Sequence, residues 1–186
     1  MMTTENALSS ETMTLLGVRV HLLTAAGIHE YIADVISQKR RVLILNVNVH
    51  CFNIAHQHAW LKDYLNHSDI TFCDGAGVML GAKILGRHIP ERITYADWMW
   101  KLAEFTENHG FSIFFLGAKP GVADQAAQKL KNRFPDLRIT CHHGYFNKEA
   151  DSEENKMVID QINAVAPNIL VLGFGMPLQE QWLKEN

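Results

Sequence analysis

Short apolar runs alternate along this chain with longer segments in which apolar residues recur at helical spacing. Five runs are typical of strands covered on both faces: Val42–Leu45, Ile70–Cys73, Phe111–Leu116, Leu137–Cys141 and Ile169–Leu172. Helices are predicted over 24–38, around 52–55 and 60–65, over 75–85, 97–108, 122–134 and 153–164, and from 179 onward. This alternation predicts an α/β fold: a Rossmann-like, mostly parallel sheet with helices on both faces.

The domain organisation follows from where this pattern starts. Residues 1–14 are polar and lack the apolar core of a secretory signal, so we expect a flexible N-terminal tail. Leu15–Val20 is predicted to be a short strand or hairpin arm. No repeat, linker or low-complexity segment divides the rest of the sequence, so residues 15–186 are predicted to form a single α/β domain.

Composition narrows the classes of function. The chain has 186 residues, 47% of them hydrophobic, and a formal net charge of -3, which argues against a nucleic-acid partner. Its three cysteines are widely spaced without a CxxC pair, so reduced thiols are expected rather than disulfides or a zinc site. The ten histidines form no HExxH frame, and we predict no metal.

Polar or glycine-rich residues follow four of the predicted strands, where α/β folds place their ligands. The first strand leads into Asn46 and Asn48, and the second delivers Asp74 and Gly75. A carboxylate at such a strand end, next to a glycine that lets a ligand approach the backbone, is a candidate catalytic base. Asp74 can equally be a simple cap of the helix that follows it.

The other two strand ends carry Gly117 and the pair Gly173 and Gly175. A strand, a glycine turn and a helix N-terminus can together cradle a phosphate. Neither loop is a Walker A motif or a GxGxxG fingerprint, so tight turns of an ordinary sheet protein are as good an interpretation.

The segment Pro177-Leu178-Gln179-Glu180 predicts a helix start from which Gln179 and Glu180 project. An amide there can bind sugar hydroxyls or a phosphate, and an acid is favoured by the helix dipole. A surface acid without further function is the competing interpretation of Glu180. Trp60, Trp98 and Trp100 are expected to pack in the core, whereas Trp182 can either pack or cover a surface.

Taken together and in order, these loops resemble the bacterial TagA/WecG/CpsF-type glycosyltransferases. The matching segments are Asn46–Asn48, Ile70–Val78, Arg87–Asp97, Phe114–Val122, Gly144–Phe146 and Leu172–Glu180. The resemblance spans roughly residues 15 to 186, and six short motifs in the right order make coincidence improbable.

The resemblance implies an inverting, metal-independent transfer without a cofactor, and it implies roles for individual residues. Asp74 matches the family's proposed general base, and Gln179 matches a glutamine expected to contact the donor sugar or its phosphate. Asn46 stands where many members carry threonine, and Tyr95 where relatives usually carry glycine. The remaining candidates for substrate or nucleotide binding are Asn48, Gly75, Arg92, Gly117, Tyr145, Gly173, Gly175 and Glu180.

The function implied is transfer of a sugar from a UDP-sugar donor to a polyprenyl-diphosphate-linked saccharide in cell-surface polysaccharide synthesis. The protein is expected in the cytoplasm, peripheral to the inner face of the membrane. Relatives dock there through a basic C-terminal segment that we expect this chain, ending at Asn186, to lack. Self-association is favoured by the family and by the apolar helices.

A non-catalytic nucleotide- or metabolite-binding module is the alternative function. A dinucleotide-dependent oxidoreductase is weaker, because the GxGxxG motif is absent.

Overall fold

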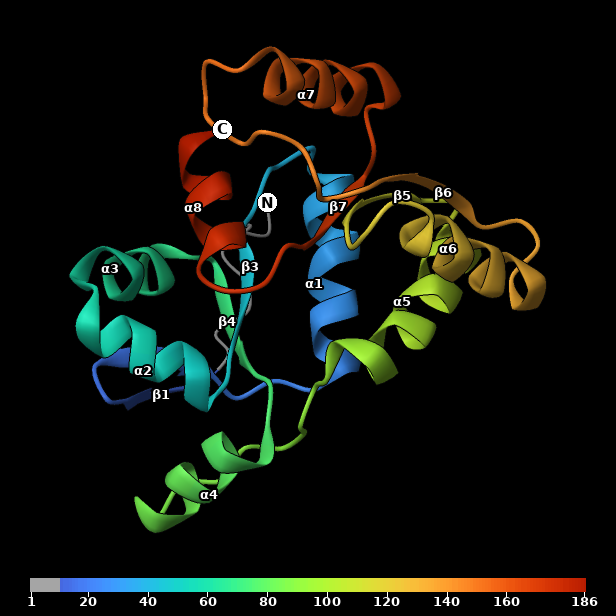
Figure 1. Ribbon diagram of the computed structural model, residues 1–186. Coiled ribbons are helices and arrows are strands. Elements are labelled where there is room, and N and C mark those ends of the chain that lie inside the picture. Colours follow the sequence, from blue (N-terminus) through green and yellow to red (C-terminus); the bar gives the residue numbers. More distant parts are fainter. Residues whose placement is uncertain (1–10) are drawn as a thin grey trace, which may run out of the picture. The chain divides into compact units, whose positions relative to one another are not determined.

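The computed structural model describes residues 11–186, which form two compact units that meet in sequence between Trp98 and Met99. Parallel strands with helices around them confirm the predicted α/β class (Figure 1). The expected tail lies outside the described residues as far as residue 10. Its last part, however, belongs to strand β1 (Thr12–Leu15).

The first unit contains a hairpin, a parallel strand pair and most of the short helices. Its elements after β1 are β2 (Val18–His21), α1 (Ala25–Ser37), β3 (Ile44–Val47), α2 (Val49–Gln57), α3 (Ala59–His67), β4 (Ile70–Cys73) and α4 (Ala76–Ile84). Strands β1 and β2 pair antiparallel, and β3 and β4 pair in parallel with Val47 opposite Cys73. The carboxyl ends of β3 and β4 therefore lie side by side.

Helix α1 illustrates how local sequence sets these elements. The Thr24 hydroxyl accepts a hydrogen bond from the Gly27 N–H at 3.1 Å and caps the helix, at the start of the predicted range 24–38. Ile28, Ile32 and Val35 repeat at helical spacing and are all buried. The predicted apolar stripe is confirmed.

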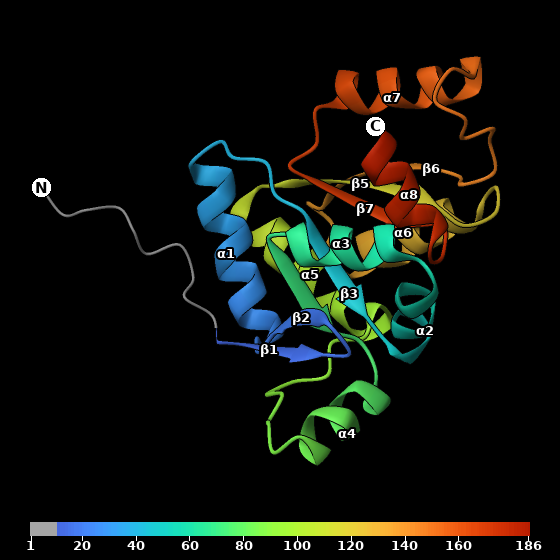
Figure 2. The same cartoon turned by 90° about the vertical axis from the view of Figure 1, so that its left-hand side faces the viewer.

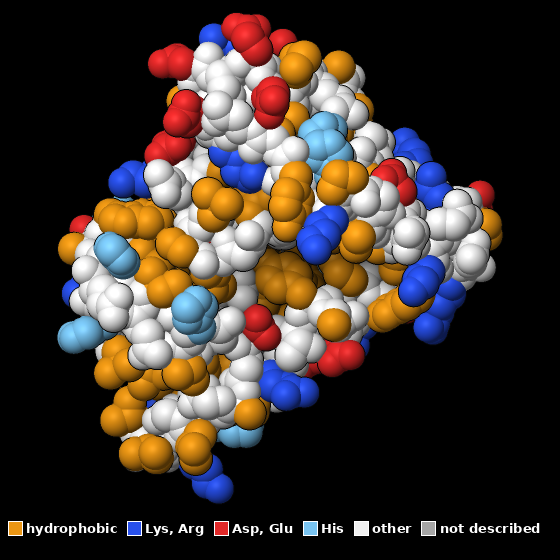
Figure 3. Space-filling model, viewed as in Figure 1, with side chains coloured by type: hydrophobic (Ala, Val, Ile, Leu, Met, Phe, Trp, Pro, Cys, Tyr) orange, Lys and Arg blue, Asp and Glu red, His pale blue; other side chains and the backbone are white. Residues whose placement is uncertain are grey.

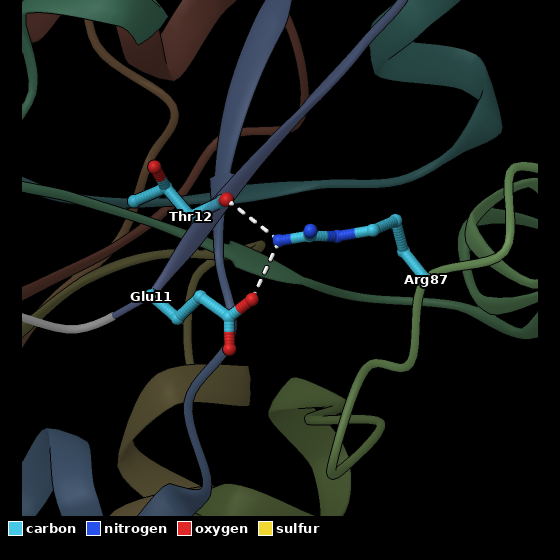
Figure 4. A network of polar contacts seen from close by, with 3 residues as sticks. All are labelled: Glu11, Thr12 and Arg87. Atoms are coloured by element: carbon cyan, nitrogen blue, oxygen red, sulfur yellow. Dashed lines mark hydrogen bonds and ion pairs between the residues drawn. The ribbon is translucent and has the colours of Figure 1, made fainter.

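Helix α4 lies beside the β1–β2 hairpin at the edge of the first unit (Figure 2). The Arg87 guanidinium, just after this helix, donates to the Glu11 carboxylate at 2.7 Å and to the Thr12 carbonyl at 3.2 Å (Figure 4). Both partners precede or begin β1. The ion pair thus ties the chain after α4 to the hairpin.

The second unit is a three-stranded parallel sheet in the order β6-β5-β7. Helix α5 (Tyr95–His109) enters it and is followed by β5 (Ser112–Gly117), α6 (Val122–Arg133), β6 (Arg138–His142), α7 (Glu153–Val165), β7 (Ile169–Gly173) and α8 (Leu178–Glu185). Each predicted strand of this half is present, with ends shifted by one residue.

Helices cover both faces of this sheet. Phe114 and Leu116 of β5 pack in one cluster with Val158 of α7 and Trp182 of α8. Cys141, which lies opposite Phe115 in the register, contacts the backbone of α6 on the other face. The prediction of a doubly covered sheet is confirmed here.

A buried polar network seats α8 against α7. The Trp182 indole N–H donates to the Asn155 side-chain carbonyl at 2.7 Å, and the Asn155 amide donates to Asn186 at 2.9 Å. Asn155 is completely buried, so losing a partner would leave a polar group unsatisfied in the core. Nothing in the sequence pattern had singled out Asn155. Its role is to hold the helix that carries Gln179.

One expectation about packing is corrected, and one open question is decided. Trp100, predicted to be a core residue, is 39% exposed and lies under the Arg133 guanidinium, 5.7 Å from the ring centre. Helix α5 begins at Tyr95, two residues before the predicted start. Trp98 and Trp100 are two residues apart, about 200° around the helix axis, so the side that buries Trp98 leaves Trp100 outward. Trp182, for which two interpretations were open, is buried.

Candidate active site

The Asp74 carboxylate is the centre of a polar cluster in the first unit. It follows β4 directly, and its backbone N–H donates to the Val47 carbonyl of β3 at 2.8 Å. The buried Asn46 side chain donates to the Asp74 carboxylate at 2.9 Å. The parallel pairing of β3 and β4 thus brings two predicted site residues into direct contact.

The environment of Asp74 pulls its pKa in opposite directions. Burial raises the pKa above its ordinary value, because the charged form loses hydration. Hydrogen bonds from Asn46 and Asn48 and the positive charge of Arg92 oppose this rise. The net shift is upward, so this carboxylate binds a proton more readily than an exposed aspartate does. It is also only half-buried and can be reached from solvent.

Asn48 has a second task in this cluster. Its side-chain oxygen accepts a hydrogen bond from the Cys51 N–H at 2.9 Å and caps α2. The alternative that Asp74 caps α4 finds no support, because α4 has Gly75 at its N-cap and no side-chain capping bond. Gly75 adopts a φ of 130°, which side-chain-bearing residues rarely adopt. The Asp74 side chain therefore belongs to the polar cluster and does not cap α4.

The loop before α5 adds Arg92 to the cluster. The Ile93 N–H donates to the Cys73 carbonyl at 3.0 Å, so this loop returns to the end of β4. Arg92 is exposed and close enough to lower the pKa of Asp74. Tyr95, which stands where relatives usually carry glycine, is half-buried, and its ring centre lies 6.0 Å from that of Phe72 and 5.6 Å from that of Trp98.

Two glycines of the second unit, Gly117 at the end of β5 and Gly144 after β6, have no room for a side chain. A side-chain carbon on Gly117 would lie 2.6 Å from the Gly173 carbonyl oxygen, and one on Gly144 would lie 2.9 Å from the Phe174 ring. These two positions need glycine because the chain itself approaches them. Gly175 differs, since open space surrounds it and its φ is 85°. The tight-turn interpretation therefore explains Gly117.

A lysine that sequence reasoning missed lies at this same edge. The Lys148 ammonium is 4.4 Å from the centre of the Phe146 ring and 4.6 Å from that of Phe174, and it donates to the Gly144 carbonyl. Burial lowers the pKa of Lys148. Cation–π contact and the carbonyl hold the loop after β6 against the turn after β7. Tyr145 and Phe146, shortly before it, were its only signal in the sequence.

Gln179 and Glu180 form a pair in the first turn of α8. The Gln179 amide donates to one carboxylate oxygen of Glu180 at 2.8 Å, and the other oxygen is buried without a hydrogen-bond partner. Glu180 is completely buried, and burial raises its pKa. The surface-acid interpretation of Glu180 is therefore wrong. Tyr145, in contrast, is 63% exposed.

Two further features of the described residues bear on ligands. In residues 11–186 no three His, Cys, Asp or Glu side chains gather as a metal site would require. An open hollow of about 410 Å³ is lined by Glu11, Leu22, Gly86, Arg87, His88 and Pro90, a set that shares no member with the predicted site.

Within residues 11–186, no helix has the length and apolar character to span a bilayer.

Fold and clusters define an α/β protein in which each unit places predicted site residues at the carboxyl ends of parallel strands. Unit one joins Asp74 with Asn46, Asn48, Gly75 and Arg92, and unit two gathers Gly117, Gly173, Gly175, Gln179 and Glu180. The sequence profile of the Glycosyl transferase WecG/TagA/CpsF family matches residues 13–186. The chain therefore belongs to that family of glycosyltransferases, which confirms the resemblance.

Curated relatives agree with this assignment. Proteins of Staphylococcus aureus, among them those of strains NCTC 8325 / PS 47 and COL, are 25% identical over 184 residues, covering 98% of this chain and 70% of theirs. Both are named N-acetylglucosaminyldiphosphoundecaprenol N-acetyl-beta-D-mannosaminyltransferase.

Proposed function

We propose that this protein transfers a hexose-type sugar from a UDP-sugar to a polyprenyl-diphosphate-linked saccharide, with inversion at the anomeric carbon and without a metal ion. The observation that carries the proposal is the Asp74 carboxylate, half-buried at the end of β4 and held by Asn46. The names of the relatives supply the chemistry of acceptor and sugar: a diphosphoundecaprenol-linked N-acetylglucosamine and N-acetylmannosamine.

In this reaction the acceptor hydroxyl oxygen attacks the anomeric carbon of the donor. The bond from that carbon to the diphosphate oxygen breaks, UDP leaves with the bonding electrons, and Asp74 takes the hydroxyl proton. A single displacement inverts the anomeric configuration. Asp74 suits the role because burial raises its pKa, which strengthens it as a base, while Asn46, Asn48 and Arg92 limit that rise.

We assign the donor to the second unit. Gln179 projects from the first turn of α8, where the helix dipole favours a phosphate or a polar sugar group. Gly175 leaves the backbone open beside it. Polyprenyl acceptors reside in membranes, and UDP-sugars in the cytoplasm, so we place the reaction at the inner face of the cell membrane.

The decisive experiment offers UDP-sugars one at a time with a polyprenyl-diphosphate N-acetylglucosamine acceptor. Asp74→Asn preserves the shape of the side chain but removes the base, and we expect transfer to fall by about 10²–10⁴-fold. Asp63→Asn on α3, an exposed aspartate away from the cluster, should transfer at the wild-type rate. Proton NMR of the product reports inversion, and added EDTA should leave the rate unchanged.

Near-wild-type transfer by Asp74→Asn would remove the base from the mechanism. UDP binding by calorimetry without transfer of any sugar would instead support the non-catalytic nucleotide-binding module.

Asn46→Ala sharpens the assignment through the pH dependence of kcat/KM. The Asn46 hydrogen bond holds down the pKa of Asp74, so its loss should move the acidic limb of the profile to higher pH. Loss of a hydrogen bond to a charged group is expected to lower kcat/KM about ten-fold or more at neutral pH. A uniform drop without movement of the limb would mean that Asn46 serves only the fold.

A further inference from the structure

The outer side of helix α4 and its C-cap carries large apolar residues that are exposed to water. Leu80, Ile84 and Leu85 are 60%, 76% and 57% exposed. A helix that is apolar on all sides is normally buried, and a surface helix turns polar residues outward. Figure 3 shows hydrophobic side chains gathered at the lower end of the view, where Figure 1 places α4, with a basic side chain at the tip.

The inner side of the same helix is already packed. Val78 and Ala82 are buried. A side-chain carbon on Gly77 would lie 2.4 Å from the Val49 side chain of α2, and one on Gly81 would lie 3.5 Å from Leu15 of β1. The helix therefore cannot roll its apolar outer residues inward without giving up this contact. The exposure of Leu80 and Ile84 is a fixed property of the first unit.

Charge indicates what covers this face. The segment 75–90 contains Lys83, Arg87 and His88 but no acidic residue, although the whole chain has a formal net charge of -3. Arg87 is paired with Glu11, whereas Lys83 is exposed on the outer side between Leu80 and Ile84. A lysine among leucines can bury its stem and keep its ammonium at a polar boundary. Two copies meeting on this face would bring their lysines together, which disfavours a dimer.

We propose that the outer face of α4 docks on the surface of an anionic lipid bilayer. Leu80, Ile84 and Leu85 enter the boundary of the acyl chains, and Lys83 contacts the phosphate groups of the lipids. The helix begins two residues after Asp74, and it rises about 1.5 Å per residue, so its apolar end lies on the order of 12 Å along the helix from the start. If the proposed function holds, the docked helix brings the base near a membrane-held acceptor.

Vesicle sedimentation without any substrate tests the docking by itself. The chain should sediment with vesicles of phosphatidylglycerol and phosphatidylcholine, and Leu80→Gln/Ile84→Gln/Leu85→Gln should bind them at least about ten-fold more weakly. Val122→Gln/Met157→Gln, which changes exposed apolar residues of the second unit, is the matched control and should bind as wild type. Circular dichroism confirms that the triple variant is folded.

A single charge change separates the two parts of the contact. Lys83→Gln should weaken binding to vesicles containing phosphatidylglycerol about five-fold and leave binding to pure phosphatidylcholine unchanged. Asp74→Asn should sediment like wild type, so failure of the transfer reaction and failure of docking are distinguishable.

Equal sedimentation of wild type and the triple variant would overturn the proposal, as would a wild-type chain that stays in solution. A concentration-dependent dimer that the triple variant loses, with no vesicle binding, would assign the face to a second copy of the chain.

Discussion

Each of the two units has an acidic side chain among the polar residues that follow its parallel strands, but the two acids differ in exposure. The acid of the first unit can be reached from solvent, whereas the acid of the second unit is buried. Asp74 is half-buried and receives the amide of Asn46, whereas Glu180 is completely buried with one oxygen unpaired. A reacting carboxylate needs access and a controlled pKa; a sealed one can only support its neighbours. Under the proposed function, we expect the first unit to carry the reacting carboxylate, and the buried Glu180 of the second unit to position its neighbour Gln179.

The surroundings of the two acids differ as well. The Asp74 cluster consists of side chains that bear hydrogen-bonding groups, whereas in the second unit Gly117 and Gly144 lie tightly against backbone and an aromatic ring. The first cluster should therefore tolerate small structural changes but not chemical ones. The tightly packed glycine positions of the second unit should instead be sensitive to any added side-chain volume.

The largest effect should follow from Gly117→Ala. The added carbon would lie 2.6 Å from the Gly173 carbonyl, which is backbone of the paired strand and cannot yield easily. We expect a loss of about 2–3 kcal/mol in the free energy of unfolding of the second unit, measured by urea titration.

Gly173→Ala is the matched control in the same register pair. Its added carbon would meet the nearest atoms at 3.9 Å and 4.0 Å, which is ordinary contact, so its stability should stay close to wild type. Equal losses in the two variants would mean that the packing of this edge does not decide the effect.

A smaller effect, with a sign set by pH, is expected for Glu180. Burial raises its pKa above the ordinary 4.5, so the folded protein holds a proton that the unfolded chain releases. The contribution of Glu180 to stability is thus fully present below pH 4.5 and is lost as the pH rises through the folded-state pKa.

Glu180→Gln cannot ionise, and its carbonyl can still accept a hydrogen bond from Gln179. Thermal unfolding followed from about pH 4 to about pH 8 should therefore show a decline in the stability of the wild type that the variant lacks. Parallel curves for the two proteins would show that Glu180 keeps an ordinary pKa in the fold.

A comparison of Asp74 and Glu180 shows how much of the candidate site can be predicted from the sequence. Asp74 could be found because an apolar run ends at an acid followed by glycine, and both the strand and the turn are local features. Glu180 was also singled out, but its burial could not be read from Pro177 and Gln179. The helix that carries Glu180 is held in place by the hydrogen bond from Trp182 to Asn155, 27 residues apart in sequence, and no local pattern predicts such a contact.

The strand and helix order was predicted nearly throughout, because apolar periodicity is set within each element. Three features that depend on packing were not predicted from the sequence: the division between Trp98 and Met99, the outward side chain of Trp100, and the Lys148 ammonium between two rings. All three depend on contacts between residues remote in sequence. No local pattern encodes them.

The smallest expected effect tests whether Asn48, besides capping α2, also influences the proposed reaction through Asp74. Asn48 caps α2 and also lowers the pKa of Asp74, whereas Ser152 caps α7 in the second unit by accepting from the Asn155 N–H at 3.1 Å. Asn48→Ala and Ser152→Ala should each cost about 1 kcal/mol of stability in denaturant titrations. Only Asn48→Ala should also move the acidic limb of the kcat/KM profile to higher pH, because only that amide reaches the reacting carboxylate. If both variants left the profile in place, Asn48 would be a helix cap alone, and Asn46 would remain the amide that controls Asp74.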